Sequence, residues 1–178
     1  MKYTAFLMLS LITIKSALAQ DVDLSKMSTE NTWFKVGLNA GLPLQSTSVK
    51  ESKFILGLDA SLQFLETKAS GIGIKSGYSH YFSAIDNVKS IGEIPLAIMY
   101  RFYPKTSGFF TGLDIGYSFI VNSLNTKGGF MGRPHMGYHG DNWNIFGYYN
   151  IVLIEEANQS NIQSLGISIT RNIRLRGK

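Results

Sequence analysis

The residues best suited to chemistry are an aspartate, two histidines and a serine in the second half of the chain. Asp114 and Ser118 fall on one face of a predicted strand, and His135 and His139 fall on one face of the next. If the two strands pair around residues 125–126, Asp114 lies diagonally opposite both histidines. An Asp–His couple beside a serine hydroxyl is the arrangement with which a hydrolase activates its nucleophile.

The histidines also raise the question of a metal site. His135 and His139 are four residues apart, so on an extended strand they share a face but lie about 13 Å from each other, at ~3.3 Å per residue. One metal ion cannot bridge that distance. The chain contains no cysteine, which excludes thiolate ligands, cysteine nucleophiles and disulfides. We therefore predict no metal site and no cofactor.

Residues 1–19 have the features of a secretory signal peptide. Lys2 supplies a positive start, an apolar stretch runs over 3–14, and Ala17 and Ala19 form the small-x-small pattern that signal peptidase cuts. The first mature residue would be Gln20 or Asp21. The apolar stretch is too short for a membrane helix, which needs about 20 residues. We therefore predict export with cleavage of this segment.

The charges of the mature chain are nearly balanced and widely scattered. Loss of Lys2 and Lys15 with the signal leaves 15 of the 17 basic residues against 12 acidic ones, a net charge of +3. No run of lysine or arginine forms a nucleic-acid-binding surface, so we exclude nucleic acid as a partner. No mature segment approaches 18 consecutive apolar residues, and a membrane role would therefore have to use strands.

The mature sequence alternates between apolar and small or polar residues, which is the period of a strand with one apolar face. In residues 109–122, for example, Leu113 and Ile115 share the apolar face while Asp114 lies on the other. We predict an all-β fold, an eight-stranded antiparallel up-and-down transmembrane β-barrel, in one domain over 33–178 that follows a polar lead over 20–32. Eight is the strand number of the smallest closed membrane barrels. The predicted strands are 33–44, 54–65, 71–83, 92–103, 109–122, 129–139, 143–155 and 162–175.

Alternation alone does not say which face of each strand points inward. Two features favour a membrane barrel with its polar faces inside. Glycines gather on the polar faces, which suits the crowded inside of a narrow barrel, and aromatic residues gather near the strand ends, as at the interfaces of membrane barrels. The predicted aromatic belts are Trp33, Phe34, Phe64, Phe102, Tyr103, Phe109, Phe110, Tyr138 and Trp143 at one rim and Phe54, Tyr81, Phe82, Phe119 and Phe130 at the other.

The predicted interior holds charges of both signs. Asp59 and Lys75 are equidistant from Thr67, the centre of a predicted hairpin, and we expect them to pair. Long side chains such as Gln63 and Met99 point into the same space, so we expect an interior that is filled and conducts no ions. The interior polar network that the pattern predicts is Asp59, Lys75, Glu93, Arg101, Asp114, Arg133 and His135.

The segment from Glu93 to Phe102, with Ile94-Pro95-Leu96 near its start and aromatics at its end, resembles the fourth-strand signature of a known family. This is the small bacterial outer-membrane β-barrel domain family, the OmpA-like and PorT-like barrels. The resemblance implies an outer-membrane location. Many such barrels end on an aromatic residue, and this sequence departs from them because it ends on Ile173 to Lys178.

Enclosure explains the Asp–His couple without catalysis, because charged groups inside a narrow barrel must pair. Lipid A deacylase-type barrels carry a His-x-Ser motif, which neither His80-Tyr81-Phe82 nor His139-Gly140-Asp141 matches. We therefore predict no catalytic residue and a structural or interaction barrel in the bacterial outer membrane. Its expected partners are outer-membrane lipid and an envelope protein of unspecified identity. The alternatives are an outer-membrane barrel that hydrolyses lipid or peptide and a soluble exported barrel that binds an apolar ligand.

Overall fold

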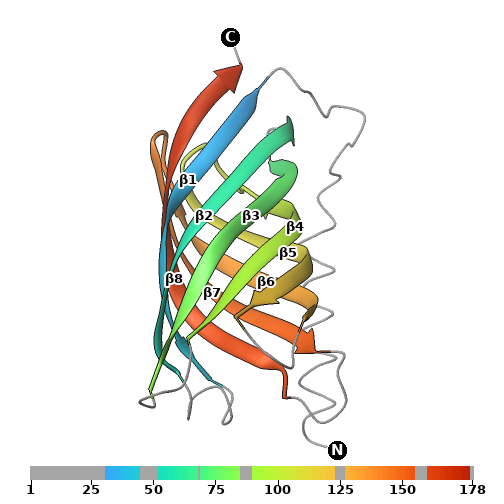
Figure 1. Ribbon diagram of the computed structural model, residues 1–178. Coiled ribbons are helices and arrows are strands. Elements are labelled where there is room, and N and C mark those ends of the chain that lie inside the picture. Colours follow the sequence, from blue (N-terminus) through green and yellow to red (C-terminus); the bar gives the residue numbers. More distant parts are fainter. Residues whose placement is uncertain are drawn as a thin grey trace, which may run out of the picture.

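Eight antiparallel strands form one closed barrel, in which each strand pairs with its neighbours in sequence and β8 pairs with β1 (Figure 1). The computed structural model describes residues 31–44, 52–67, 69–84, 90–122, 127–154 and 160–176. The eight-stranded up-and-down fold is therefore confirmed, with strand ends within two residues of those expected. The strands are β1 (Thr32–Pro43), β2 (Ser52–Glu66), β3 (Ser70–Ser83), β4 (Ile91–Phe102), β5 (Gly108–Val121), β6 (Gly128–His139), β7 (Trp143–Ile154) and β8 (Ile162–Arg176).

The predicted signal peptide over 1–19 and its cleavage residues Ala17, Ala19 and Gln20 lie outside the described residues. Most of the predicted polar lead over 20–32 does so as well. Its last residue, Thr32, already belongs to β1. Among the described residues, no helix is long and apolar enough to cross a membrane.

Large apolar side chains cover the outside of the barrel. Leu38 and Ile98 are 66% and 65% exposed, whereas their chain neighbours Asn39 and Met99 are 3% and 0% exposed. Successive strand residues point to opposite faces, so this contrast places the apolar face outward and the other face inside. The sequence left open which face of each strand points inward, and the structure shows that the polar face does.

The two ends of the barrel differ in the length of their connections. Residues 67–69, 103–107 and 140–142 join strands at one end, which we call the short-turn end, and β1 begins and β8 finishes there. At the first of these turns, the Thr67 hydroxyl oxygen accepts hydrogen bonds from the backbone N–H groups of Ala69 and Ser70. Residues 44–51, 84–90, 122–127 and 155–161 join strands at the other end, the long-loop end.

Two prolines interrupt the strand pairing without ending a strand. Pairing of β3 with β4 stops at Leu96 and resumes at Glu93, so it skips Pro95. Pairing of β6 with β7 likewise skips Pro134, although this residue pairs with Leu113 of β5 on its other side. Proline lacks an N–H donor and can bond through its carbonyl only. Strand β6 therefore continues through its proline, although its pairing with β7 is interrupted there.

The inward glycines let the strands bend closely against one another. A Cβ on Gly116 would collide with the carbonyl oxygen of Leu96 on β4, and one on Gly73 would collide with that of Leu62 on β2. Gly132 faces outward, and the nearest atom to a Cβ there would be Ile151 Cγ2, 3.6 Å away. Glycine is therefore required at positions 73 and 116 on the inner face but not at position 132 on the outer face.

We predict that Gly116→Ala lowers the free energy of unfolding by about 1–3 kcal/mol, because the added methyl group overpacks the inside of the ring. Gly132→Ala is the matched control and should leave it unchanged to within about 0.5 kcal/mol. Urea titration of the protein refolded in lipid vesicles measures both values. Equal losses in the two variants would contradict the close approach inside the barrel.

We also predict that the folded protein migrates differently on SDS gels before and after boiling. A closed ring of paired strands has no free edge at which detergent can begin to separate it. The control is circular dichroism of the unboiled sample, which must show strand structure. Identical migration of a folded sample in both conditions would argue against the closed barrel.

Candidate functional site

All seven residues of the predicted interior network lie inside the barrel. Their exposed fractions run from 0% for Asp114 to 5% for Arg101, and Lys35, which carries a further interior charge, is 7% exposed. They form two groups. Glu93 stands apart, and the other members are Asp59, Lys75, Arg101, Asp114, Arg133 and His135, which we call the central ionic cluster.

Asp114 on β5 is one of the two carboxylates of this cluster. Its Oδ1 lies 3.0 Å from Arg101 Nη1, and its Oδ2 lies 3.2 Å from Lys75 Nζ. His135 Nδ1 is 3.9 Å from the same Oδ2 and 3.1 Å from Arg101 Nη1. Asp114 is therefore the point at which strands β3, β4, β5 and β6 are joined through their side chains.

Asp59 on β2 is the second carboxylate. Arg133 donates to both of its oxygens at 3.1 and 3.2 Å, and the Ser168 hydroxyl donates to Oδ2 at 2.6 Å. Lys75 Nζ lies 3.2 Å from Oδ1 and so links Asp59 to Asp114. The Arg133 guanidinium also lies over the ring of Tyr148, 3.6 Å from its centroid. The two carboxylates thus connect strands across the barrel as well as between neighbours.

The structure brings Asp59 and Lys75 together, but in a different register from the one expected. The hairpin turns about one residue later than Thr67, so Asp59 lies opposite Gly77 rather than opposite Lys75, and a β-bulge between Gln63 and Leu65 shifts the pairing by one residue. The lysine reaches the carboxylate diagonally. The two residues are in contact as predicted, but the argument from their equal spacing about Thr67 was wrong.

The register between β5 and β6 also differs from the prediction. Asp114 lies opposite Arg133, and His135 is its diagonal neighbour. His139 lies opposite Gly108, and its Nε2 is 3.0 Å from the Lys105 carbonyl oxygen. The prediction that both histidines flank Asp114 is wrong for His139, because the strands turn about two residues earlier than residues 125–126.

Glu93 forms the second polar group, nearer the long-loop end. It accepts hydrogen bonds from the hydroxyls of Tyr81 at 2.6 Å and Ser118 at 2.7 Å, and from Asn150 Nδ2 at 3.1 and 3.2 Å. Among the described residues, no cation lies within 4 Å of this carboxylate, so neutral donors solvate it. Ser118, the serine considered as a nucleophile, therefore donates its hydroxyl hydrogen bond to Glu93.

Aromatic side chains fill the barrel at the short-turn end. Tyr103, Phe110 and Phe146 form a buried cluster, and Arg101 lies over the rings of Phe110 and Phe146, 5.8 and 5.4 Å from their centroids. The Tyr103 hydroxyl accepts from Lys35 Nζ at 2.9 Å and donates to Gln63 Oε1 at 3.0 Å. This aromatic cluster lies directly on the central ionic cluster.

Three aromatics of the predicted belts are therefore placed wrongly. Tyr103, Phe110 and Tyr81 are 9%, 1% and 1% exposed and point into the barrel. Phe110 and Tyr81 have the same parity along their strands as the inward Asp114 and Lys75, and this signal could have identified them. Phe109 and Tyr138, by contrast, are more than half exposed, as a belt requires.

Apolar side chains fill the barrel at the long-loop end. Val152 and Met131 are 0% and 1% exposed in this second cluster, and Tyr81 connects it to Glu93 through its hydroxyl. Together with the aromatic cluster it closes off the charged middle of the barrel. The apolar cluster consists of Ile55, Tyr81, Ala97, Ile120, Met131, Val152 and Ile162.

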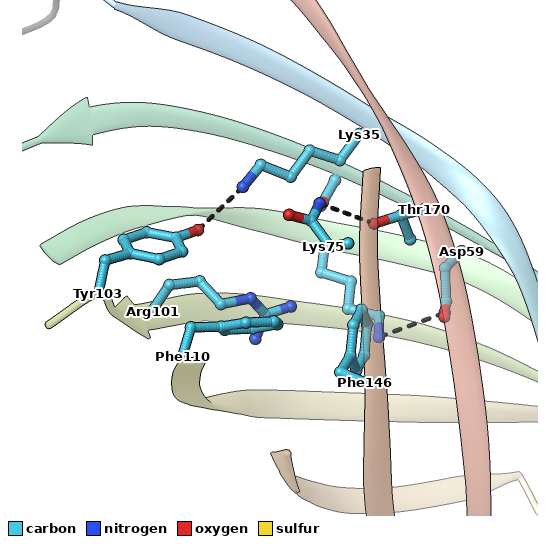
Figure 2. Close-up of a pocket in the computed structure, with 10 residues that line it drawn as sticks. Lys35, Asp59, Lys75, Arg101, Tyr103, Phe110, Phe146 and Thr170 are labelled. Atoms are coloured by element: carbon cyan, nitrogen blue, oxygen red, sulfur yellow. Dashed lines mark hydrogen bonds and ion pairs between the residues drawn. The ribbon is translucent and has the colours of Figure 1, made fainter. Parts of the chain in front are cut away.

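One small cavity lies between Lys35 and the central ionic cluster. Its volume is about 10 Å³, which is roughly the room of one water molecule. Figure 2 shows Lys35 and Tyr103 on one side of it and Lys75 with Asp59 on another. A space of this size does not admit an organic substrate. In the part of the chain that the structure describes, no three His, Asp or Glu side chains are grouped to hold a metal ion.

The fold is shared with known outer-membrane proteins. The crystal structure of the outer membrane protein OprG from Pseudomonas aeruginosa matches with a TM-score of 0.50 and 12% identity, over 87% of this chain and 100% of that one. The N-terminal β-barrel domain of OprF from Pseudomonas aeruginosa matches with a TM-score of 0.51 and 12% identity, over 83% and 99%. At such low identity the likeness shows the fold alone.

No protein-family model matches the sequence, and no curated protein matches it significantly. The fold therefore defines the class, a small closed antiparallel β-barrel. The narrower resemblance to OmpA-like and PorT-like barrels, based on the segment from Glu93 to Phe102, stays a prediction.

The charge count of the central ionic cluster leads to a prediction. Two carboxylates, Asp59 and Asp114, face three cations, Lys75, Arg101 and Arg133. Asp114→Asn leaves three cations against one carboxylate and should lower the free energy of unfolding by about 3–5 kcal/mol. Lys75→Met leaves two charges of each sign and should lower the free energy of unfolding clearly less than Asp114→Asn does.

The measurement is urea unfolding in lipid vesicles, followed by tryptophan fluorescence. The double variant Asp114→Asn/Lys75→Met should lose less stability than the sum of the single losses, because the groups share contacts. A Lys75→Met loss as large as that of Asp114→Asn would show that charge balance does not govern the cluster.

Proposed function

We propose that this chain is a bacterial outer-membrane β-barrel protein, exported by a cleaved signal peptide, that serves a structural or interaction role without catalysis. The observation that carries the proposal is the separation of charge from apolar surface. Seven charged strand residues are buried inside, while leucines and isoleucines on every side of the ring are exposed. An exposed apolar surface of this extent is unfavourable in water and favourable in lipid.

The interior supports a role that does not use the lumen. Aromatic and apolar side chains fill the two ends, and paired charges fill the middle. The expected partners are therefore those that can reach the outside of the barrel or its loops, namely outer-membrane lipid and an envelope protein. Longer loops of membrane barrels commonly face the outside of the cell, so the short-turn end is assigned to the periplasm.

The hydrolase alternative is less well supported by the side-chain geometry. The proposed Asp–His couple needs its histidine within hydrogen-bond reach of the serine, whereas Ser118 donates to Glu93 and His135 faces Arg101 and Asp114. The alternative of a soluble barrel that holds an apolar ligand needs an apolar lumen, and here the charges occupy it. Detergent-dependent extraction from a membrane pellet distinguishes the soluble alternative from the proposal.

The filled interior predicts that the purified protein gives no steady single-channel steps in a planar bilayer. Eight-stranded barrels have just enough interior room for side chains, and here long residues such as Met99, Arg101 and Arg133 occupy it. The control is an open porin reconstituted in the same bilayer. Stable steps whose size changes in Arg101→Ala or Arg133→Ala would contradict the closed interior and indicate a channel.

A further inference from the structure

One charged residue lies on the lipid-facing surface of the barrel with apolar neighbours on both sides. Arg171 on β8 is exposed, and so are Ile169 and Ile173, the residues two positions before and after it on the same face. The other exposed charges within the described strands lie at strand ends. These are Lys53, the second residue of β2, and Arg174 and Arg176, among the last three residues of β8.

A tryptophan holds the Arg171 side chain from the neighbouring strand. Arg171 pairs with Trp143, the first residue of β7, and its Cζ lies 5.6 Å from the ring centroid. The tryptophan is 50% exposed and marks the level at which the short-turn end meets the membrane interface. The guanidinium therefore lies at the depth of lipid headgroups rather than in the hydrocarbon core.

The donors of Arg171 are available to a ligand. The structure records no hydrogen bond or ion pair between its side chain and any described residue, and its one recorded partner is the Trp143 ring. Asp141, in the turn before β7, makes no ion pair with it. Arg174, three residues further along β8, has the parity of the inward residues and lies over the Trp33 ring, 5.4 Å from its centroid, so it belongs to the other face of the strand.

We propose that Arg171, positioned by Trp143, binds the phosphate of an anionic phospholipid in the membrane leaflet at the short-turn end. The inference rests on the membrane location proposed above. A guanidinium presents several N–H donors in one plane and binds phosphate oxygens bidentately. One face lies against an aromatic ring, and the edge of the group remains open to a headgroup beside the barrel. The net negative charge of the lipid provides the selectivity.

The test is native mass spectrometry of the full protein in detergent with equal amounts of phosphatidylglycerol and phosphatidylcholine. We expect wild-type protein to retain phosphatidylglycerol about fivefold more than phosphatidylcholine, the preference that one basic residue near the headgroups provides. Arg171→Ala should reduce this ratio to about one. Lys105→Ala is the matched control, because it removes the same charge from an exposed turn on the opposite side of the short-turn end and should keep the preference.

Equal retention of the two lipids by wild-type protein would overturn the phosphate site while leaving the membrane barrel standing. Retention of neither lipid would count against both proposals. An unchanged ratio in Arg171→Ala, or an equal drop in Lys105→Ala, would also overturn the assignment to Arg171. The lipid preference of the wild-type protein tests the phosphate site even if a variant does not fold. Arg171→Lys provides a second variant, which keeps the charge but loses bidentate binding.

Discussion

The rest of the structure depends on the sharing of two buried carboxylates among three buried cations. Asp59 and Asp114 lie where water is excluded, and an unpaired charge there would be strongly destabilising. Lys75 contacts both carboxylates, so each half of the network depends on the other. Residues on β2, β3, β4, β5 and β6 have to be in register at once to satisfy these contacts. The network thereby specifies the alignment of strands whose apolar outer faces could slide past one another in lipid.

Glycine and long side chains divide the remaining space between them. A Cβ on Gly112 would collide with His135 Nε2 and come within 2.9 Å of Arg101 Nη1, and one on Gly71 would meet the Gln63 amide. Each long polar side chain thus lies against the wall where a glycine leaves room. This explains why the inward glycines of β3 and β5 do not open a channel along one side, and why the cavity beside Lys35 has the size of one water molecule.

The sequence allowed the fold and the inward faces to be predicted. A period of two shows which residues share a face, and glycines on the polar faces with aromatics near the strand ends indicated which face is inside. Eight is also the strand number of the smallest closed membrane barrels. Two kinds of detail could not be predicted in this way. The register of β2 with β3 depends on where the hairpin turns and on a bulge at Gln63 and Leu65, and the alternation specifies neither. The location of Phe110 was predicted wrongly because aromatic residues near strand ends were assigned to the interface, although parity placed this residue inside with Asp114. Alternation therefore determined the face of each residue but not its height or its exact partner.

A filled lumen restricts where this barrel can interact with anything else. Polar groups in the middle are occupied with one another, as Glu93 is with Tyr81, Ser118 and Asn150, so a ligand would have to displace contacts that several strands share. Among the described residues, Arg171 is the one Lys, Arg, Asp or Glu side chain on the lipid-facing surface between the strand ends. An arginine is tolerated on such a surface near the interface but is costly in the middle of the bilayer. Its position beside Trp143 therefore fits the proposed contact with headgroups, which would set the depth of β8 in the membrane.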